Sequence, residues 1–416
     1  MLQVLRCRAL TGLTVINARV LTLAEGEAPR RGAALGDLAV IDRGFVRIEG
    51  DRIAAVGAGE PDRTPAGPVI DAGGCVLMPG FVDCHTHACW AGERFDEFEM
   101  KLAGRSYLEI LAAGGGIMST VRAVRAADLD MLARGLLLRL ARMAALGSTT
   151  VEVKSGYGLT TADELKMLRA IRVAAGQAAQ TVVPTFLGAH ALDPDSPSLV
   201  DRTIDETLPA VVREFPGITC DAYCEQGAWS LEDTGRLFAE ATRLGCPLRV
   251  HADQFTSLGT TPLAVDLGAV SVDHLEATTR PDLEGLAAGE TIGVALPACG
   301  FHLDDRYAPA REFVDAGGAL ALATNYNPGS APTPSMAFVT ALAVRKLGLS
   351  TAEAIAAGTV NAACVLGLQD TLGSIEPGKR ADLQLLDFAD ERELGYEFAV
   401  PGPRFVICAG RVVKKP

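Results

Sequence analysis

Eight short apolar runs alternate with longer helical stretches through the middle of the chain, and this alternation limits the possible folds more than any other feature. The runs span residues 76–83, 149–153, 181–187, 218–223, 248–251, 270–274, 291–296 and 319–324. Strands that alternate with helices are typical of parallel sheets, because each parallel connection needs a crossover. Eight such units close a (β/α)8 barrel, so we predict an α/β protein with a TIM barrel. An open doubly wound sheet is the alternative, although no G-x-G-x-x-G follows an early strand.

The two ends of the chain differ from this middle part. Residues 12–58 alternate apolar and polar side chains with turns between them, and the runs GSIEPGKRADLQLLDF and RFVICAGRVV resemble them near the C-terminus. This alternation predicts antiparallel strands with one covered face. We therefore predict that both ends fold together as a small β-sandwich module, from residues 1–75 and 369–416, beside a metal-dependent barrel of residues 76–368.

Composition and charge narrow the classes of partner. The 416 residues are 49% hydrophobic with a net charge of −13, which indicates a globular protein and disfavours nucleic acid or an anionic membrane as partner. No apolar run reaches the length of a membrane span, and the N-terminus lacks the features of a signal peptide. We expect a cytoplasmic protein that acts on a small molecule and keeps its ten scattered cysteines reduced. A homodimer is the default expectation.

Histidines gather at the predicted strand ends. Five of the six histidines in the chain end or follow a predicted strand: His85, His87, His190, His251 and His274. The carboxyl ends of barrel strands meet at one face, where active sites form, so we predict that these histidines share one site. Within it, His274 is suited to hold or polarise a water molecule and His190 to meet a substrate carbonyl. A purely structural role is the alternative for either.

The first two histidines form half of a metal site. His85 and His87 are two residues apart at a strand end, so their side chains point to the same face. With His251 they supply three nitrogen ligands and leave a position open for water, although a buried structural histidine is the alternative for His251. We predict one divalent metal ion, zinc or iron, because imidazole suits both. Lys154 lies on the second strand and not at the end of the fourth, so we do not expect it to bridge a second ion.

Several longer runs resemble the imidazolonepropionase family of the amidohydrolase superfamily, and the resemblance covers nearly the whole chain. The most specific are EVKSGYG and NPGS, and the others are PGFVDCHTHACWAGERFDEFEMKLAGRSYLEI, AAGGGIMSTV, FLGAHAL, CEQGAWS, RVHADQF and VDHLEA. The resemblance implies hydrolysis of the ring amide of 4-imidazolone-5-propanoate to N-formimidoyl-L-glutamate, in histidine breakdown. It also implies zinc or iron at His85, His87 and His251.

The same resemblance implies a set of substrate contacts. Arg94 offers a planar, two-pronged donor for the carboxylate tail of this substrate, and Gln254 can both donate to and accept from its ring. A surface role is the alternative for Arg94. Tyr107 has a packing role as its alternative. The implied contacts are Arg94, Tyr107, Tyr157, His190, Gln254, Asn327, Gly329 and Ser330.

One residue departs from the family pattern. Asn325 ends the eighth predicted strand, where the family has an aspartate that is implied to be a metal ligand and the general base. Asn325 can offer the ion only a neutral carbonyl oxygen. It has no carboxylate to take a proton, a loss that costs roughly 10²–10⁴ in rate. The predicted catalytic residues are therefore His274, Gln254 and Asn325, with Asn325 also as the fourth metal ligand.

Three interpretations of Asn325 remain open. The chain is an inactivated variant that holds substrate without turnover, or a natural relative in which His274 or the acidity of the metal-bound water replaces the base, or a ligand-binding protein without catalysis. A different enzymatic alternative is a deaminase of a heteroaromatic amine from the same superfamily. Arg94 and the NPGS run favour a ligand with a carboxylate tail instead.

Overall fold

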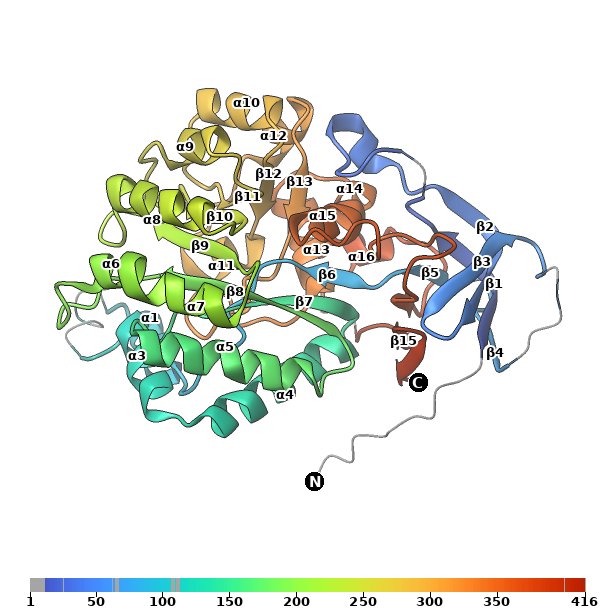
Figure 1. Cartoon of the computed structure of the whole chain (residues 1–416). Helices are drawn as coiled ribbons and strands as arrows, with labels where there is room; N and C mark the ends of the chain where they lie inside the picture. The colour runs from blue at the N-terminus through green and yellow to red at the C-terminus, as the bar shows by residue number, and fades with distance from the viewer. Residues whose placement is uncertain are drawn as a thin grey trace.

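A parallel eight-stranded barrel forms the larger part of the protein (Figure 1). The computed structural model describes residues 12–415 except 25, 62, 64–66, 106–108, 110–112 and 400. Each strand pairs in parallel with the next along the chain. The segments that follow the first and last strands meet where the Asn325 N–H donates to the His85 carbonyl over 3.0 Å. The TIM-barrel prediction is confirmed. Its strands are β6 (Phe81–Asp83), β7 (Ser148–Lys154), β8 (Thr181–Ala189), β9 (Thr219–Cys224), β10 (Leu248–Ala252), β11 (Ser271–His274), β12 (Ile292–Ala295) and β13 (Leu320–Leu322).

Helices surround the barrel, and side-chain caps fix where several of them begin. Thr160 accepts from the Asp163 N–H at the start of α5, and Ser350 and Glu353 form a reciprocal capping box at the start of α14. The described helices are α1 (Phe95–Leu102), α3 (Ile117–Ala126), α4 (Leu129–Ala145), α5 (Thr161–Ala175), α6 (Leu199–Arg202), η2 (Thr203–Thr207), α7 (Leu208–Glu214), α8 (Leu231–Arg243), α9 (Thr260–Asp266), α10 (Arg280–Ala288), α11 (Pro297–Leu303), α12 (Ala310–Asp315), α13 (Met336–Lys346), α14 (Thr351–Ala356), η3 (Ala357–Asn361), α15 (Ala362–Val365), α16 (Glu393–Tyr396) and the short η1 (Gly32–Gly36). No helix among these residues has both the length and the apolar character needed to cross a membrane.

Strands from both ends of the chain build a second, mixed sheet beside the barrel (Figure 1). This agrees with the prediction that the two ends fold together. Its order is β16-β15-β14-β5-β1-β2-β3, with β4 paired to β1. The bounds are β1 (Leu13–Leu21), β2 (Val40–Glu49), β3 (Arg52–Ala58), β4 (Val69–Asp71), β5 (Val76–Pro79), β14 (Leu383–Leu385), β15 (Phe405–Cys408) and β16 (Arg411–Lys414).

The first predicted barrel strand, over residues 76–83, is wrong as a single element. The structure divides it at Gly80: β5 pairs with β1 and β14 in the mixed sheet, and only β6 belongs to the barrel. The Gly80 N–H donates to the Asp382 carbonyl over 2.9 Å, and a Cβ at Gly80 would overlap the Thr149 side chain. A continuous apolar run does not reveal such a crossing, because both halves are buried. The domain limits stay predictions.

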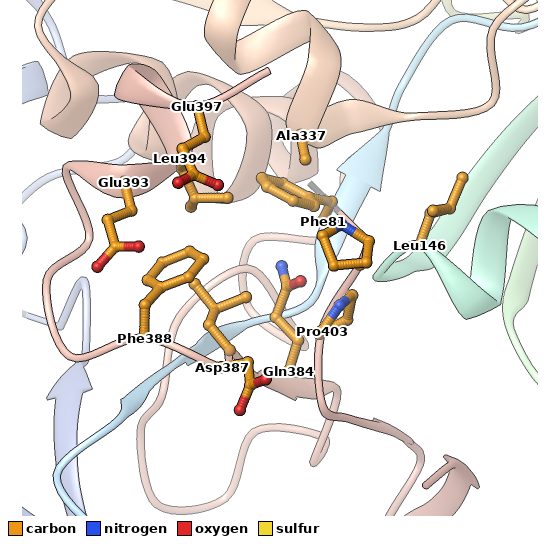
Figure 2. Close-up of a pocket in the computed structure, with 13 residues that line it drawn as sticks. Phe81, Leu146, Ala337, Gln384, Asp387, Phe388, Glu393, Leu394, Glu397 and Pro403 are labelled. Carbon is orange, nitrogen blue, oxygen red and sulfur yellow. The ribbon is translucent and has the colours of Figure 1, made fainter. Parts of the chain in front are cut away.

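A cavity of about 160 Å³ lies where the barrel meets the mixed sheet (Figure 2). Phe388, Glu393 and Leu394 lie on one side of it, and Phe81 and Leu146 lie on the other (Figure 2). Phe81 and Leu146 lie at the amino ends of β6 and β7, whereas active sites of such barrels form at the carboxyl ends. This cavity is therefore part of the junction between the two sheets and not of the histidine site.

Candidate metal centre and active site

The structure brings five histidines together at the carboxyl ends of the barrel strands. The His251 ring, on β10, lies 4.4 Å from that of His85, 5.3 Å from that of His87 and 5.6 Å from that of His274, between ring centroids. His190 follows β8 and stacks on His87 at 4.8 Å. These residues come from four different strand ends, so closure of the barrel is what assembles the group.

The histidine group fits a divalent metal ion. The Nε2 atoms of His87 and His251 are 3.3 Å apart, and two ligands on a tetrahedral ion at ~2.0–2.1 Å would be separated by roughly the same distance. Ligand atoms of His85, His251 and His274 all lie within 4.8 Å of one another. His85 Nε2 and His87 Nδ1 are buried without a hydrogen-bond partner among the described residues. Buried polar atoms are normally satisfied, so a metal ion is the physical explanation for His85 Nε2. His87 faces His251 with Nε2, so its Nδ1 would not bind the same ion.

Burial keeps these imidazoles in the form that binds metal. It lowers the pKa of His85 and of His87 well below the ordinary histidine value, and lowers the pKa of His251 to about 4. A neutral imidazole has a free lone pair for an ion, whereas a protonated one has none. The site is thus ready to ligate at neutral pH without first losing protons.

Carboxylates behind two of the histidines fix the direction of the rings. Asp273 Oδ2 lies 2.5 Å from His85 Nδ1, and Asp221 Oδ1 lies 3.1 Å from His251 Nδ1. Each carboxylate holds one ring nitrogen and leaves Nε2 to face the centre of the group. This is the arrangement by which outer-shell carboxylates orient metal-binding histidines.

The two carboxylates belong to a buried network that we call the charged floor, made of Glu152, Lys154, Asp221, Arg249 and Asp273. Lys154 Nζ lies 2.6 Å from Glu152 Oε1 and 2.7 Å from Asp221 Oδ2. Arg249 lies 3.2 Å from Glu152 Oε1 and 2.5 Å from Asp273 Oδ2. All five side chains are buried. Although burial opposes its ionisation, His251 and Lys154 lower the pKa of Asp221 well below its usual range. Lys154 is thus paired within the floor, and its lack of a role in bridging a second ion stays a prediction.

On one side of the histidines lie Tyr157, His190 and Gln254. The Tyr157 ring is 5.1 Å from that of His190, whose Nδ1 lies 3.0 Å from the Gly156 carbonyl oxygen. Gln254 Oε1 accepts from the Tyr223 hydroxyl over 2.9 Å, and Gln254 Nε2 donates to Cys299 Sγ over 3.3 Å. The three predicted substrate contacts on this side therefore lie in the same region as the metal-binding group.

On another side, Arg94 lies against the loop that follows β13. Asn327 Oδ1 accepts from the backbone N–H groups of Gly329 and Ser330, over 2.8 and 2.7 Å, which fixes the loop. The Arg94 guanidinium lies so close to Gly329 that a Cβ there would overlap it. Arg94 also donates to Glu97 over 2.9 Å. A bound carboxylate would therefore share this arginine with Glu97.

Asn325 lies in the same loop, in the left-handed backbone region with φ of 55°. Its side-chain Oδ1 accepts from Asn327 Nδ2 over 3.2 Å, and its N–H donates to the His85 carbonyl. Asp253 and His274 also have positive φ, of 54° and 91°. Such strained positions cluster at functional sites. Asn and Asp tolerate this region better than other residues with a side chain, so an aspartate at 325 could keep the same backbone.

One predicted substrate contact, the sixth histidine and several residues that the sequence analysis missed remain to be placed. Tyr107 lies outside the described residues. His302 stacks on Phe98 at 5.5 Å, and among the described residues no ring contact joins it to the histidine group. The sequence did not identify the charged floor or Glu276 and Cys299 near His274. A signal existed for the floor, because a charge inside a short apolar run, such as Arg249 in LRVHA, needs a buried partner.

Comparison with known proteins places the chain in a family. A sequence model of the amidohydrolase family matches residues 100–414. An imidazolonepropionase of Herpetosiphon aurantiacus is 46% identical over 402 residues, which is 94% of each chain. One of Symbiobacterium thermophilum is 43% identical, over 96% of this chain and 97% of its own. The chain belongs to the imidazolonepropionase family. One of Deinococcus radiodurans, 45% identical over 92% of this chain and 95% of its own, is a further relative in that family.

Solved structures share the fold of this family member at lower identity. A 5-methylcytosine deaminase from Klebsiella pneumoniae liganded with phosphonocytosine superposes with a TM-score of 0.74, at 16% identity, over 97% of this chain and 98% of its own. An adenosine deaminase from Xanthomonas campestris with bound zinc gives a TM-score of 0.68 at 20% identity, over 96% and 92%. At this level of sequence identity, these similarities show a shared fold only.

Proposed function

We propose that this protein hydrolyses the ring amide of 4-imidazolone-5-propanoate to N-formimidoyl-L-glutamate, a step in histidine degradation. The observation that carries the proposal is the group of neutral imidazoles, with carboxylates behind His85 and His251, beside Arg94 and the Asn327–Ser330 loop. It stands in a chain whose relatives named imidazolonepropionase are 43–46% identical over nearly their full length. We infer that the substrate is small, with a carboxylate tail that meets Arg94.

The metal-binding residues in this proposal are His85, His87 and His251, with Asn325 offering its carbonyl oxygen, and the ion is one zinc or iron. A divalent ion held there would supply a water molecule acidified to a pKa of about 7, and so a nucleophile near neutral pH. The chain's own residues hold the substrate. Tyr157 and His190 contact the ring amide, Gln254 hydrogen-bonds to the ring, and Asn327, Gly329 and Ser330 shape the tail pocket with Arg94.

His274 accepts the proton that a carboxylate at position 325 would otherwise accept, but less efficiently. Its Nδ1 lies 3.3 Å from Glu276 Oε1, so a neutral His274 that donates from Nδ1 keeps Nε2 free to accept a proton. The Asn325 amide cannot accept that proton. We therefore expect slow turnover, about 10²–10⁴ below that of a chain with aspartate at this position. The homodimer, the cytoplasmic location and the lack of a nucleic-acid partner stay predictions.

The test is a direct assay of substrate loss and product formation by the purified protein and by Asn325→Asp. We expect measurable hydrolysis in both, abolished by a chelator and restored by added zinc or iron. Urocanate serves as a control, because it lacks the ring amide that is cleaved. Absence of hydrolysis in both proteins at full metal occupancy would contradict the proposal, and ammonia release from purines or pterins would favour a deaminase.

A further inference from the structure

A second set of metal-ligand side chains lies on the other side of His274. Ligand atoms of His274, Glu276 and Cys299 all lie within 4.8 Å of one another. His274 Nδ1 and Glu276 Oε1 are 3.3 Å apart, close to the ligand separation that a tetrahedral zinc ion needs at ~2.0–2.1 Å. Because Nδ1 faces Glu276, Nε2 is the nitrogen left for the histidine group. The two sets therefore use opposite sides of one imidazole.

The side chain of Glu276 has one carboxylate oxygen without a partner. Its side chain is 5% exposed, and Oε2 has no hydrogen-bond partner among the described residues. A buried carboxylate oxygen without a hydrogen-bond donor or a cation costs free energy, so unpaired oxygens of this kind are rare in natural proteins. Orientation of His274 needs only Oε1. The free Oε2 is thus an observation that points to a cation.

Cys299 completes the set with the ligand type that selects zinc. It lies in the first turn of α11, is 1% exposed, and accepts a hydrogen bond from Gln254 Nε2 over 3.3 Å. Thiolate ligands favour zinc over magnesium and calcium, which prefer oxygen. Burial raises the pKa of the Cys299 thiol, so zinc must displace its proton to solvent, and the site fills only at elevated zinc.

We propose that His274 Nδ1, Glu276 and the Cys299 thiolate bind a zinc ion that inhibits the enzyme. An ion on Nδ1 places the ring proton on Nε2, so His274 can donate from that nitrogen but no longer accept a proton. The inhibitory effect rests on the proposed function, in which His274 accepts a proton. The binding of the ion does not rest on it.

The binding experiment uses Co²⁺ as the probe on protein that already holds one zinc per chain. A thiolate bound to Co²⁺ gives a charge-transfer band in the near-ultraviolet. We expect this band in the wild type and in Cys246→Ser, whose cysteine precedes β10 at the opposite end of the barrel. It should be absent from Cys299→Ser and weaker in Glu276→Gln. A wild type without the band, or a Cys299→Ser protein that keeps it, would overturn the proposal.

The second measurement is the zinc concentration that halves hydrolysis, scaled to each variant's own rate. Loss of an outer-shell group typically weakens metal binding 10–100-fold, so loss of a direct ligand should raise this concentration at least about tenfold in Cys299→Ser. An unchanged value would overturn the inhibitory role. If no variant hydrolyses the substrate, the proposed function fails, while the cobalt band still decides whether the site exists.

Discussion

The charged floor and the loop after β13 are both buried parts of one site, but different interactions hold them in place. The floor places five charged side chains in ion pairs beneath His85 and His251. The loop holds Asn325 and Asn327 with neutral amide hydrogen bonds. Breaking a buried ion pair leaves a charge without a partner, whereas an amide can be exchanged at smaller cost. The floor therefore orients His85 and His251, whereas the loop carries Asn325 at the position of the family's base.

The largest effect should come from restoring a base in the loop. We expect Asn325→Asp to raise turnover by roughly 10²–10⁴, because a positioned carboxylate accepts the proton that an amide cannot. Because the substitution also replaces a neutral proposed metal ligand with a carboxylate, the two rates are compared at full metal occupancy, which metal analysis checks. Asn17→Asp is the matched control, since Asn17 also has positive φ, 53°, but lies on β1 of the mixed sheet. Equal steady-state rates for Asn325→Asp and the wild type would show that the loop does not limit proton transfer.

Breaking the floor should destabilise the whole protein. Arg249→Met leaves Asp273 buried without this cation and Glu152 with Lys154 alone, which costs about 3–5 kcal/mol of unfolding free energy. The control is Arg243→Met, because Arg243 pairs with Glu240 at the surface and its side chain is 68% exposed. That pair is screened by solvent and should contribute little to stability. Denaturant unfolding measures both, and a similar loss in the two variants would mean that the floor contributes no special stability.

A milder change in the floor should act on the metal. Asp273→Asn keeps the shape of the side chain but removes the charge that holds His85 Nδ1. We expect metal affinity to fall 10–100-fold, as measured by competition with a chromogenic chelator. Asp201→Asn, on the surface opposite Arg236, should leave affinity as it was. Unchanged affinity in Asp273→Asn would mean that barrel packing alone orients His85.

A change of one pH unit should have the smallest effect, and it acts on the stability of the metal-free protein. Burial depresses the pKa of His251 to about 4 in the folded state, below the value of 6.5 that applies when it is unfolded. The unfolded chain therefore binds the extra proton first, and stability should fall as pH drops from 6.5 towards 4. Each such histidine contributes a slope of about 1.4 kcal/mol per pH unit. His251→Gln should flatten the curve by one such slope, and a flat wild-type curve would contradict the account.

Much of the barrel could be predicted from sequence, but the contacts inside the site could not. Short apolar runs revealed seven strands in nearly their observed positions, because alternation with helices leaves few other folds. Gly80 was missed because both sides of the crossing are buried and apolar. Glu276 and Cys299 were missed because they come from successive strand ends and meet only after the barrel closes. Pairs such as Arg249 with Asp273 depend on register between neighbouring strands, which a single sequence does not specify.

The most direct test of the account is the metal content of wild type, His251→Gln and His302→Gln after dialysis against a weak chelator. His302 is the control, because it stacks on Phe98 and, in the part of the chain that the structure describes, no ring contact joins it to the histidine group. The account predicts one zinc or iron per chain in the wild type and in His302→Gln, and a large loss in His251→Gln. A wild type without stoichiometric metal, or a His251→Gln protein that keeps it, would contradict the claim that these histidines hold a catalytic ion.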